Sequence, residues 1–346
     1  MVNQRKTSED LEQRIQDSYR DYFSRSNLKA MKILRVSTGV NPKLPERSIQ
    51  VQFGELIRIP YGEGLEKLSA LIEATGTKPN EDIVQQGYRF YFDQDDDDCM
   101  IKLNKLTGIK PSLHEKGVRE KLYGYLENVW IEEYLELQKL TGIKLRESDI
   151  RKIYLSKARF GDTNEITEIQ KATKVKPIFS ERDSSNVQKG YLCLWREHKD
   201  LAEGHMLTHS KSELKDIGEI FRKFYGITGI KPEESVVQQG YKKFIDSGML
   251  ISLKSLLMAT EVPLRQDDVI SGYNKYLNFN SQWIDRGFEW LQQLIKISGV
   301  KPDVDLVQKA YLRYIKSDNR FAIKKLFEVT GVEPNVKIYK TSIGLL

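Results

Sequence analysis

The chain has 346 residues, of which 39% are hydrophobic and 30% charged, and its formal net charge is +6. This composition suits a helical protein that is soluble in water, and the mildly basic charge permits a polyanionic partner without requiring one. The two cysteines give no disulfide framework, the first residues lack the apolar core of a signal peptide, and no stretch approaches about 18 apolar residues. We therefore expect a soluble, intracellular protein without a membrane span.

One unit recurs along the chain, and its clearest copy runs from Thr228 to Thr260. It opens with Thr-Gly-Ile-Lys-Pro (228–232), continues with an apolar-periodic run over 236–245, and breaks at Gly248 before a second apolar run over 250–258. Glycine takes the left-handed position past a last helical turn, and proline prevents the helix from continuing. The unit is therefore predicted to be two helices with a stop between them.

Nine copies of the unit align on one apolar residue of the first helix, which we call the anchor. The anchors are Tyr19, Phe53, Tyr88, Leu122, Tyr154, Tyr191, Tyr241, Tyr273 and Tyr311. Successive anchors are 32 to 38 residues apart, except for 50 residues between the sixth and seventh. An aliphatic residue stands four positions before every anchor, and an apolar one three positions after all but one, so each first helix has one buried face.

A hairpin of this size cannot bury its apolar face alone, so the copies are expected to stack into one continuous core. The sequence predicts an all-α fold, a single right-handed α-solenoid of about nine helix-turn-helix repeats. The approximate repeat boundaries are 8–40, 41–77, 78–109, 110–143, 144–176, 177–230, 231–262, 263–300 and 301–332, and a capping helix is expected over 335–346.

Local signals refine the reading of the second to fourth repeats. The segment from Ile49 to Ile59 alternates like a strand, but the repeat frame predicts a helix there. The acidic run 93–98 either caps the following helix or holds a cation, although it lacks the glycine and glutamate of a calcium loop. Ser112 and Glu115 have the spacing of a capping box and predict a helix start.

Two features of the frame concern packing and helix ends. Lys174 and Glu261 replace the glycine of the junction, and a left-handed conformation there would cost about 1–2 kcal/mol, so we expect these two helices to end differently. The residue before the anchor is often small, which predicts a close approach of backbones. The small residues are Ser18, Gly87, Gly190, Gly240, Gly272 and Ala310.

The unit resembles the tetratricopeptide and pentatricopeptide superfamily of helical hairpin repeats. Gly-Ile-Lys-Pro before the first helix looks like a pentatricopeptide junction, and Gly248 falls where that family has an inter-helix glycine. The Trp-Leu-Gly-Tyr pattern of tetratricopeptides is absent, so a divergent relative and an independent hairpin solenoid both stay open. The resemblance implies a binding surface, either for a peptide or for single-stranded RNA.

The long sixth spacing points to a polar insertion over 196–215 or to lengthened helices. Three of the four histidines lie there, namely His198, His205 and His209. His205 and His209 are spaced i,i+4, which can place two imidazoles on one helical face for zinc, whereas the alternative is a solvated insertion. No P-loop, nucleophile elbow or His-Glu-x-x-His occurs, so we expect neither catalysis nor a cofactor.

The position three residues before the anchor carries glutamine or arginine in eight repeats. These residues are Gln16, Gln50, Gln85, Arg119, Arg151, Gln188, Gln238 and Gln308. Basic residues follow one or two positions after several anchors, namely Arg20, Arg89, Lys242, Lys243, Lys275 and Arg313.

Three interpretations of these rows stay open. The amides could meet base edges and the cations phosphates of single-stranded RNA, as in other helical-repeat readers of RNA. The glutamines could instead bond backbone groups of the neighbouring junction. The solenoid could also be a scaffold that binds a protein or peptide on its concave surface. The paired tyrosines, such as Tyr88 and Tyr91, are expected in the core rather than as stacking platforms.

Overall fold

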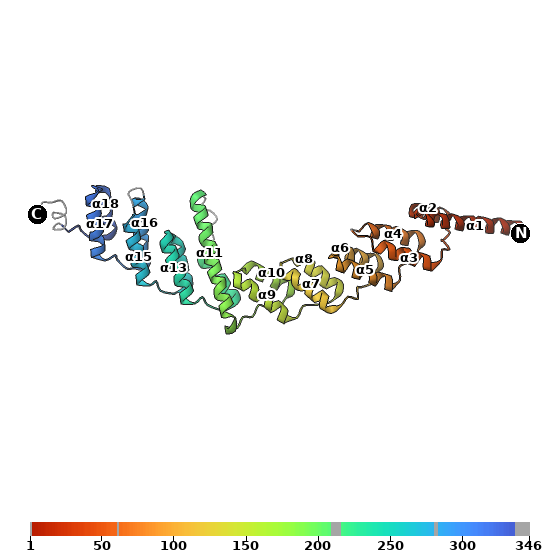
Figure 1. Cartoon of the computed structure of the whole chain (residues 1–346), viewed down its shortest axis with the longest axis horizontal. Coiled ribbons are helices and arrows are strands. Elements are labelled where there is room, and N and C mark those ends of the chain that lie inside the picture. The colour runs from red at the N-terminus through yellow and green to blue at the C-terminus, as the bar shows by residue number, and fades with distance from the viewer. Residues whose placement is uncertain (1, 61, 209–215, 280–282, 336–346) are drawn as a thin grey trace. The chain divides into compact units, whose positions relative to one another are not determined.

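The computed structural model describes residues 2–60, 62–208, 216–279 and 283–335, with side chains described from residue 9 onward and outside 199–208. Within these ranges the chain is helical throughout, apart from its turns and junctions, and contains no strand. The predicted all-α fold is confirmed (Figure 1). The predicted capping helix falls almost wholly on 336–346, outside the described residues.

The described residues form nine helical hairpins, as the repeat frame predicts. The first helices are α1 (Val2–Ser24), α3 (Glu46–Ile57), α5 (Glu81–Asp93), α7 (Glu115–Glu127), α9 (Glu147–Phe160), α11 (Ser184–Thr208), α13 (Glu234–Ser247), α15 (Gln266–Leu277) and α17 (Val304–Lys316). The second helices are α2 (Leu28–Thr38), α4 (Glu63–Thr75), α6 (Asp97–Thr107), α8 (Ile131–Thr141), α10 (Thr163–Thr173), α12 (Ile217–Thr228), α14 (Leu250–Thr260), α16 (Ile284–Ser298) and α18 (Arg320–Thr330). A short 3-10 turn, η1 (Glu181–Asp183), precedes α11.

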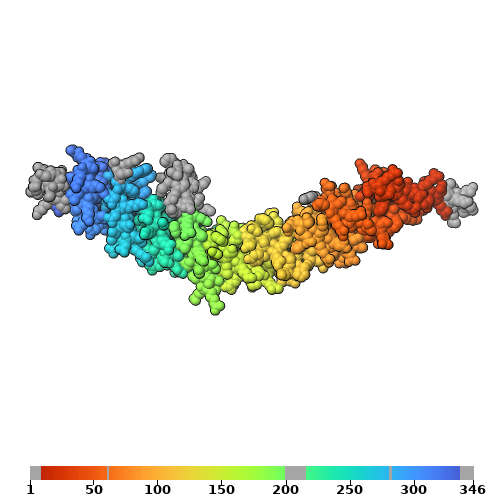
Figure 2. Space-filling model, viewed as in Figure 1, coloured from red at the N-terminus to blue at the C-terminus, as the bar shows by residue number. Residues whose placement is uncertain are grey.

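The chain divides into two compact units, Met1–Ile150 and Arg151–Leu346. In the first unit α2 packs on α4, α4 on α6, and α6 on α8. In the second unit α10, α12, α14, α16 and α18 pack in the same consecutive order. Within each unit the colours follow the chain from one hairpin to the next without mixing (Figure 2). Each unit is thus an array in which a hairpin packs mainly on its sequence neighbours, while the right-handed twist stays a prediction.

The anchors form the core of both units. All nine are buried, and none is more than 1% exposed. The paired tyrosines also lie in the core, as predicted, since Tyr91, Tyr276 and Tyr314 are 0%, 2% and 3% exposed. The alternating segment of the second repeat is helix α3, because Ile49 and Phe53 need one helical face to reach this core.

Every second helix ends in threonine or serine, a feature that holds the junction to the next repeat. At the end of α12, in the sixth repeat, the hydroxyl of Thr228 donates to the Phe224 carbonyl at 2.9 Å and accepts the N–H of Ile230 at 3.3 Å. The anchor hydroxyl of Tyr191 then donates to the Ile230 carbonyl at 2.8 Å. Seven anchors are tyrosines that make this last bond in their own repeats. The turn is therefore fixed relative to the first helix.

The expectation that Lys174 and Glu261 end their helices differently is wrong. Both adopt the left-handed conformation, with φ of 61° and 58°, against 67° for Gly229. Their N–H groups donate to the carbonyls four residues back, at 2.9 Å and 3.0 Å, as the glycines do. The contacts that hold each junction therefore outweigh the 1–2 kcal/mol cost of a side chain in this conformation.

The helix start predicted from Ser112 and Glu115 is confirmed, but the capping box itself does not form. Helix α7 does begin at Glu115, but its N-cap is His114, which makes no side-chain cap bond. The Ser112 N–H instead donates to Gln85 Oε1. A bond across the repeat thus replaces the local capping pattern.

The acidic run of the third repeat acts as a cap, one of its two predicted roles. The Asp96 carboxylate accepts the N–H of Cys99 at 3.0 Å at the start of α6. Asp97 and Asp95 pair with Lys121 of the next first helix at 2.7 Å and 3.1 Å. The run therefore starts one helix and ties it to the following repeat.

Small residues before the anchors do permit close approach. A Cβ on Gly190 would overlap the Ala158 carbonyl oxygen of the preceding first helix, and one on Gly87 would overlap the side chain of Ile57. The wide sixth spacing arises at least partly from a lengthened helix, because α11 continues to Thr208. The described part of the insertion is thus helical as far as that residue.

Candidate functional site

The glutamines three positions before the anchor are tied to the junction that follows their own hairpin. In the sixth repeat Gln188 Nε2 donates to the Lys231 carbonyl at 2.9 Å, and Oε1 accepts the N–H of Glu233 at 2.7 Å. These two residues flank Pro232, which has no N–H of its own. The side-chain amide of Gln188 therefore forms hydrogen bonds to the backbone on both sides of the proline.

Four other repeats make the same pair of bonds. The glutamines are Gln16, Gln50, Gln85 and Gln308, and their eight bonds measure 2.6 to 3.0 Å. Gln238 makes only one such bond, to the Pro263 carbonyl at 2.7 Å, and its Oε1 is buried without a partner. We call this arrangement the amide clamp.

The two arginines in the row have internal partners as well. Arg119 Nε donates to the Lys144 carbonyl at 3.3 Å, and its guanidinium pairs with Glu115. Arg151 pairs with Asp183 at 2.8 Å. Burial raises the pKa of the Asp183 carboxyl, but hydrogen bonds from Ser180 and the nearby Arg151 together lower it by more, so that the pKa lies below its ordinary value. These contacts are those expected of a row that ties each repeat to its junction.

The basic residues after the anchors fall into two groups. Lys275 donates to the Asp246 carbonyl, Arg313 donates to the Leu277 carbonyl and Asn278 Oδ1, and Arg20 pairs with Asp17 at 3.1 Å. The first two bond to the end of the preceding first helix and so tie neighbouring repeats together.

The other group points to solvent. Arg89, Lys242 and Lys243 are exposed and make no ion pair within the described parts of the chain. Arg89 belongs to helix α5 of the first unit, and Lys242 and Lys243 belong to helix α13 of the second unit. Of the basic residues singled out after the anchors, these three are the ones available to a ligand.

A second set of exposed cations was missed from the sequence. It consists of the lysine three residues after the threonine or serine that ends a second helix, and occurs in six of nine repeats, at Lys78, Lys110, Lys144, Lys176, Lys231 and Lys301. All six are exposed, and none forms an ion pair with a described residue. The signal was present in the recurring Gly-Ile-Lys-Pro, whose lysine was read only as part of a helix ending.

Of the three predicted zinc ligands, only His198 has a described side chain, so the zinc site stays a prediction. His198 is 5% exposed, and its Nε2 lies 2.9 Å from Ser252 Oγ. Burial lowers the pKa of His198 below its ordinary value, and the Asp216 carboxylate opposes this shift. The side chain of His205 and the whole of His209 lie outside the description, and the described residues contain no cluster of three or more potential metal ligands.

The thiol of Cys99, in the third repeat, is a poor nucleophile. Cys99 is buried, and burial together with Asp96 raises the pKa of its thiol to about 12. A thiol with this pKa carries almost no thiolate near neutral pH, and the thiolate is the nucleophilic form.

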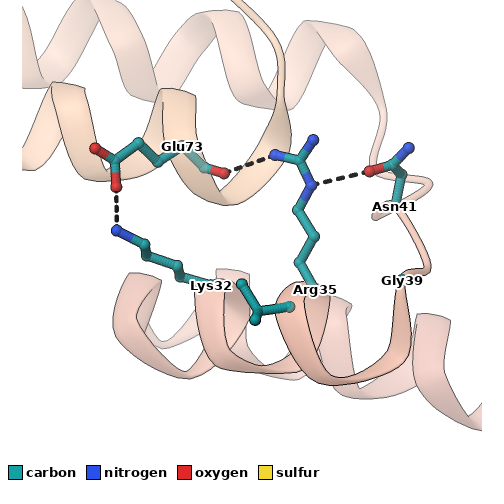
Figure 3. Close-up of a pocket in the computed structure, with 6 residues that line it drawn as sticks. Lys32, Arg35, Gly39, Asn41 and Glu73 are labelled. Atoms are coloured by element: carbon teal, nitrogen blue, oxygen red, sulfur yellow. Dashed lines mark hydrogen bonds and ion pairs between the residues drawn. The ribbon is translucent and has the colours of Figure 1, made fainter.

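An open depression lies between the first two repeats (Figure 3). Arg35 crosses it, donating through Nε to Asn41 Oδ1 at 2.9 Å and through a terminal nitrogen to the Glu73 carbonyl at 2.7 Å. Lys32 pairs with the Glu73 carboxylate on the same wall. These polar groups satisfy one another, so the depression offers a ligand few free partners.

No protein-family model, no curated protein and no solved structure matches this chain. No helix in the described ranges is both long enough and apolar enough to cross a membrane. The fold therefore rests on the nine hairpins and their contacts, and the likeness to tetratricopeptide and pentatricopeptide repeats stays a resemblance of motif.

Proposed function

We propose that the chain is a non-catalytic helical-repeat module that binds single-stranded RNA through its sugar–phosphate backbone. The amide clamps bond both the nitrogen and the oxygen of five glutamine side chains to the protein's own backbone, which fixes the orientation of those amides toward the junction and leaves each only one N–H and one oxygen lone pair. Binding would therefore be independent of RNA sequence, unlike the base reading that the glutamine row first suggested.

The observation that carries the proposal is the presence of exposed cations without acidic partners. Arg89 and Lys242 occupy the same position, one residue after the anchor, and Lys243 stands beside the second of them. A cation that is already paired gains little from a phosphate, whereas an unpaired one releases a counterion from the nucleic acid when it binds. The net charge of +6 adds long-range attraction.

Titration of a fluorescein-labelled oligouridylate at several salt concentrations tests this function. We expect log affinity to fall with log salt, and the K242Q/K243Q variant to flatten that slope by about 1.4, at about 0.7 per contact. The matched control is Lys275→Gln, which removes a cation already bonded to backbone and should leave the slope unchanged. A wild-type chain that shows no salt-dependent binding would refute the proposal.

Helix α14 supports a second candidate, a scaffold for another protein. Its outer residues Ile251 and Met258 are 84% and 68% exposed, although Leu250, Leu253 and Leu256 already bury the inner face. A helix that is apolar on both faces is normally covered. Lys254 lies between the two exposed residues along the helix, so an amphipathic segment with an acidic residue opposite Lys254 fits this face.

The scaffold candidate is tested with I251E/M258E. A partner protein purified with the wild-type chain should lose its affinity for this variant and keep it for the control V51E, which changes an exposed valine of α3. Equal binding of that purified partner to both variants would exclude α14 as the docking face.

A further inference from the structure

The six junction lysines share more than their position in the sequence. Each stands three residues after the threonine or serine that ends a second helix, and all are exposed and without ion pairs among the described residues. Among the other exposed lysines some form ion pairs, such as Lys32 and Lys43, and others, such as Lys67, form none with a described residue. The glutamates in the first turn of the following helices, such as Glu81 and Glu147, make none with the junction lysines.

The backbone of these lysines is held in place by the repeat. The carbonyls of Lys78, Lys110 and Lys231 accept amide-clamp bonds at 3.0, 2.8 and 2.9 Å. Where the anchor is a tyrosine, the carbonyl of the residue before the lysine also accepts the anchor hydroxyl, as Ile109 does from Tyr88 at 2.6 Å. The backbone at Lys110 and Lys231 is thus held by both bonds and that at Lys78 by the clamp alone, while the side chains are exposed.

Successive lysines stand at the ends of helices that pack on one another. Lys78, Lys110 and Lys144 follow α4, α6 and α8, which pack in that order in the first unit. Packed helices lie on the order of 10 Å apart, so we expect the backbones of these three lysines to recur along one edge at about that interval. In the second unit Lys176 and Lys231 follow the packed helices α10 and α12 in the same way.

We propose that this edge, which we call the lysine edge, holds the phosphates of a single-stranded nucleic acid. A ligand for a row of like charges must itself repeat a negative charge, as a phosphate backbone does and a folded acidic surface does not. A single strand can adjust its path to the spacing of the lysines, whereas a duplex is stiff over about 150 base pairs. The inference rests on the proposed RNA binding and assigns it a site that the first-helix cations do not provide.

A purely structural role for the same lysines makes a different prediction. Cations near a helix C-terminus interact favourably with the helix dipole. If that were their whole purpose, removing them would lower thermal stability and leave RNA affinity unchanged. Binding and stability therefore separate the two roles.

The test compares two triple variants of the first unit in the oligouridylate titration. K78Q/K110Q/K144Q removes the lysine edge, and K67Q/K105Q/K139Q removes three exposed lysines from the bodies of the same helices α4, α6 and α8. Both lose the same charge. We expect the first variant to flatten the slope of log affinity against log salt by about two units and the second to leave it nearly unchanged.

The outcomes separate the inference from the function on which it rests. If the wild-type chain does not bind the probe, the proposed function fails and the inference fails with it. If the wild type binds and the two triple variants lose equally, or the lysine-edge variant loses nothing, the inference is overturned while RNA binding stands. Circular dichroism checks that each variant is folded. If the lysine-edge triple variant is not folded, the single variant Lys110→Gln takes its place, with an expected decrease of about 0.7 in the slope of log affinity against log salt.

Discussion

At the scale of single residues, the most informative side chain is the glutamine that looked like a reader of bases. Its constancy along the chain has a structural reason, since each clamp serves the same backbone geometry around a junction proline. A residue that reads a sequence has to vary between repeats, and a residue that grips a fixed turn does not. The constancy of the row therefore pointed to the clamp, and the hydrogen bonds of Gln188 show the clamp directly.

Replacing Gln188 with alanine should lower the free energy of unfolding by about 1–3 kcal/mol, because the Lys231 carbonyl and the Glu233 N–H lose their partner. Urea titration followed by circular dichroism measures the loss. The control is Gln239→Ala, an exposed glutamine on the next first helix, with an expected change within about 0.5 kcal/mol. Equal losses in the two variants would contradict the clamp.

At the scale of elements, the second helices all end in the same way although their sequences differ. Lys174 and Glu261 take the left-handed position that glycine takes in the other seven repeats. The threonine hydroxyls of both helices still bond to the carbonyl four residues back, at 2.8 and 2.9 Å. The junction thus imposes its backbone geometry on residues that disfavour it.

Replacing Lys174 or Glu261 with glycine should stabilise the protein. Removing a side chain from the left-handed conformation gains about 1–2 kcal/mol, and the greater freedom of glycine in the unfolded chain offsets about 0.5–1 kcal/mol. We expect a net gain of about 0.5–1 kcal/mol from each change, seen as a higher midpoint of urea unfolding. The opposite change, Gly229→Ala, should destabilise the chain, and a gain there would show that this conformation carries no strain.

At the scale of the whole molecule, each hairpin depends on the next for its core. The buried anchors and the bonds from Lys275 and Arg313 to the preceding helix end all connect neighbours. Helices of adjacent repeats approach closely at Gly190, where a Cβ would overlap the Ala158 carbonyl oxygen. Backbone cannot move aside as a flexible side chain can.

Gly190→Ala should therefore cost about 1–3 kcal/mol of stability, in line with other overpacked cores. Gly240→Ala occupies the same frame position, but its Cβ would stand 3.2 Å from the end of the Leu256 side chain, which can shift. The helical preference of alanine, worth about 0.5–1 kcal/mol, should leave that variant close to the wild type. Thermal unfolding compares the two, and an equal loss would show that the approach of backbones at Gly190 is not limiting.

The sequence by itself determined the number of hairpins, their helical class and the buried anchors, because these follow from periodicity within one helix. Tyr241 and its partners at i−4 and i+3 share a face wherever the chain is helical. The role of the acidic run stayed open for the opposite reason. Asp96 caps its own helix, which is local, but Asp97 meets Lys121, which is 24 residues away.

Only the tertiary structure decided what the polar side chains do. The glutamine clamps, the left-handed Lys174 and the burial of His198 all depend on groups brought together across a junction or from another helix. The lysine of the lysine edge recurs visibly in the sequence, but only the structure shows that these lysines lack acidic partners among the described residues. Periodicity specifies which face of a helix is apolar, whereas the partner of a polar group depends on how the hairpins pack.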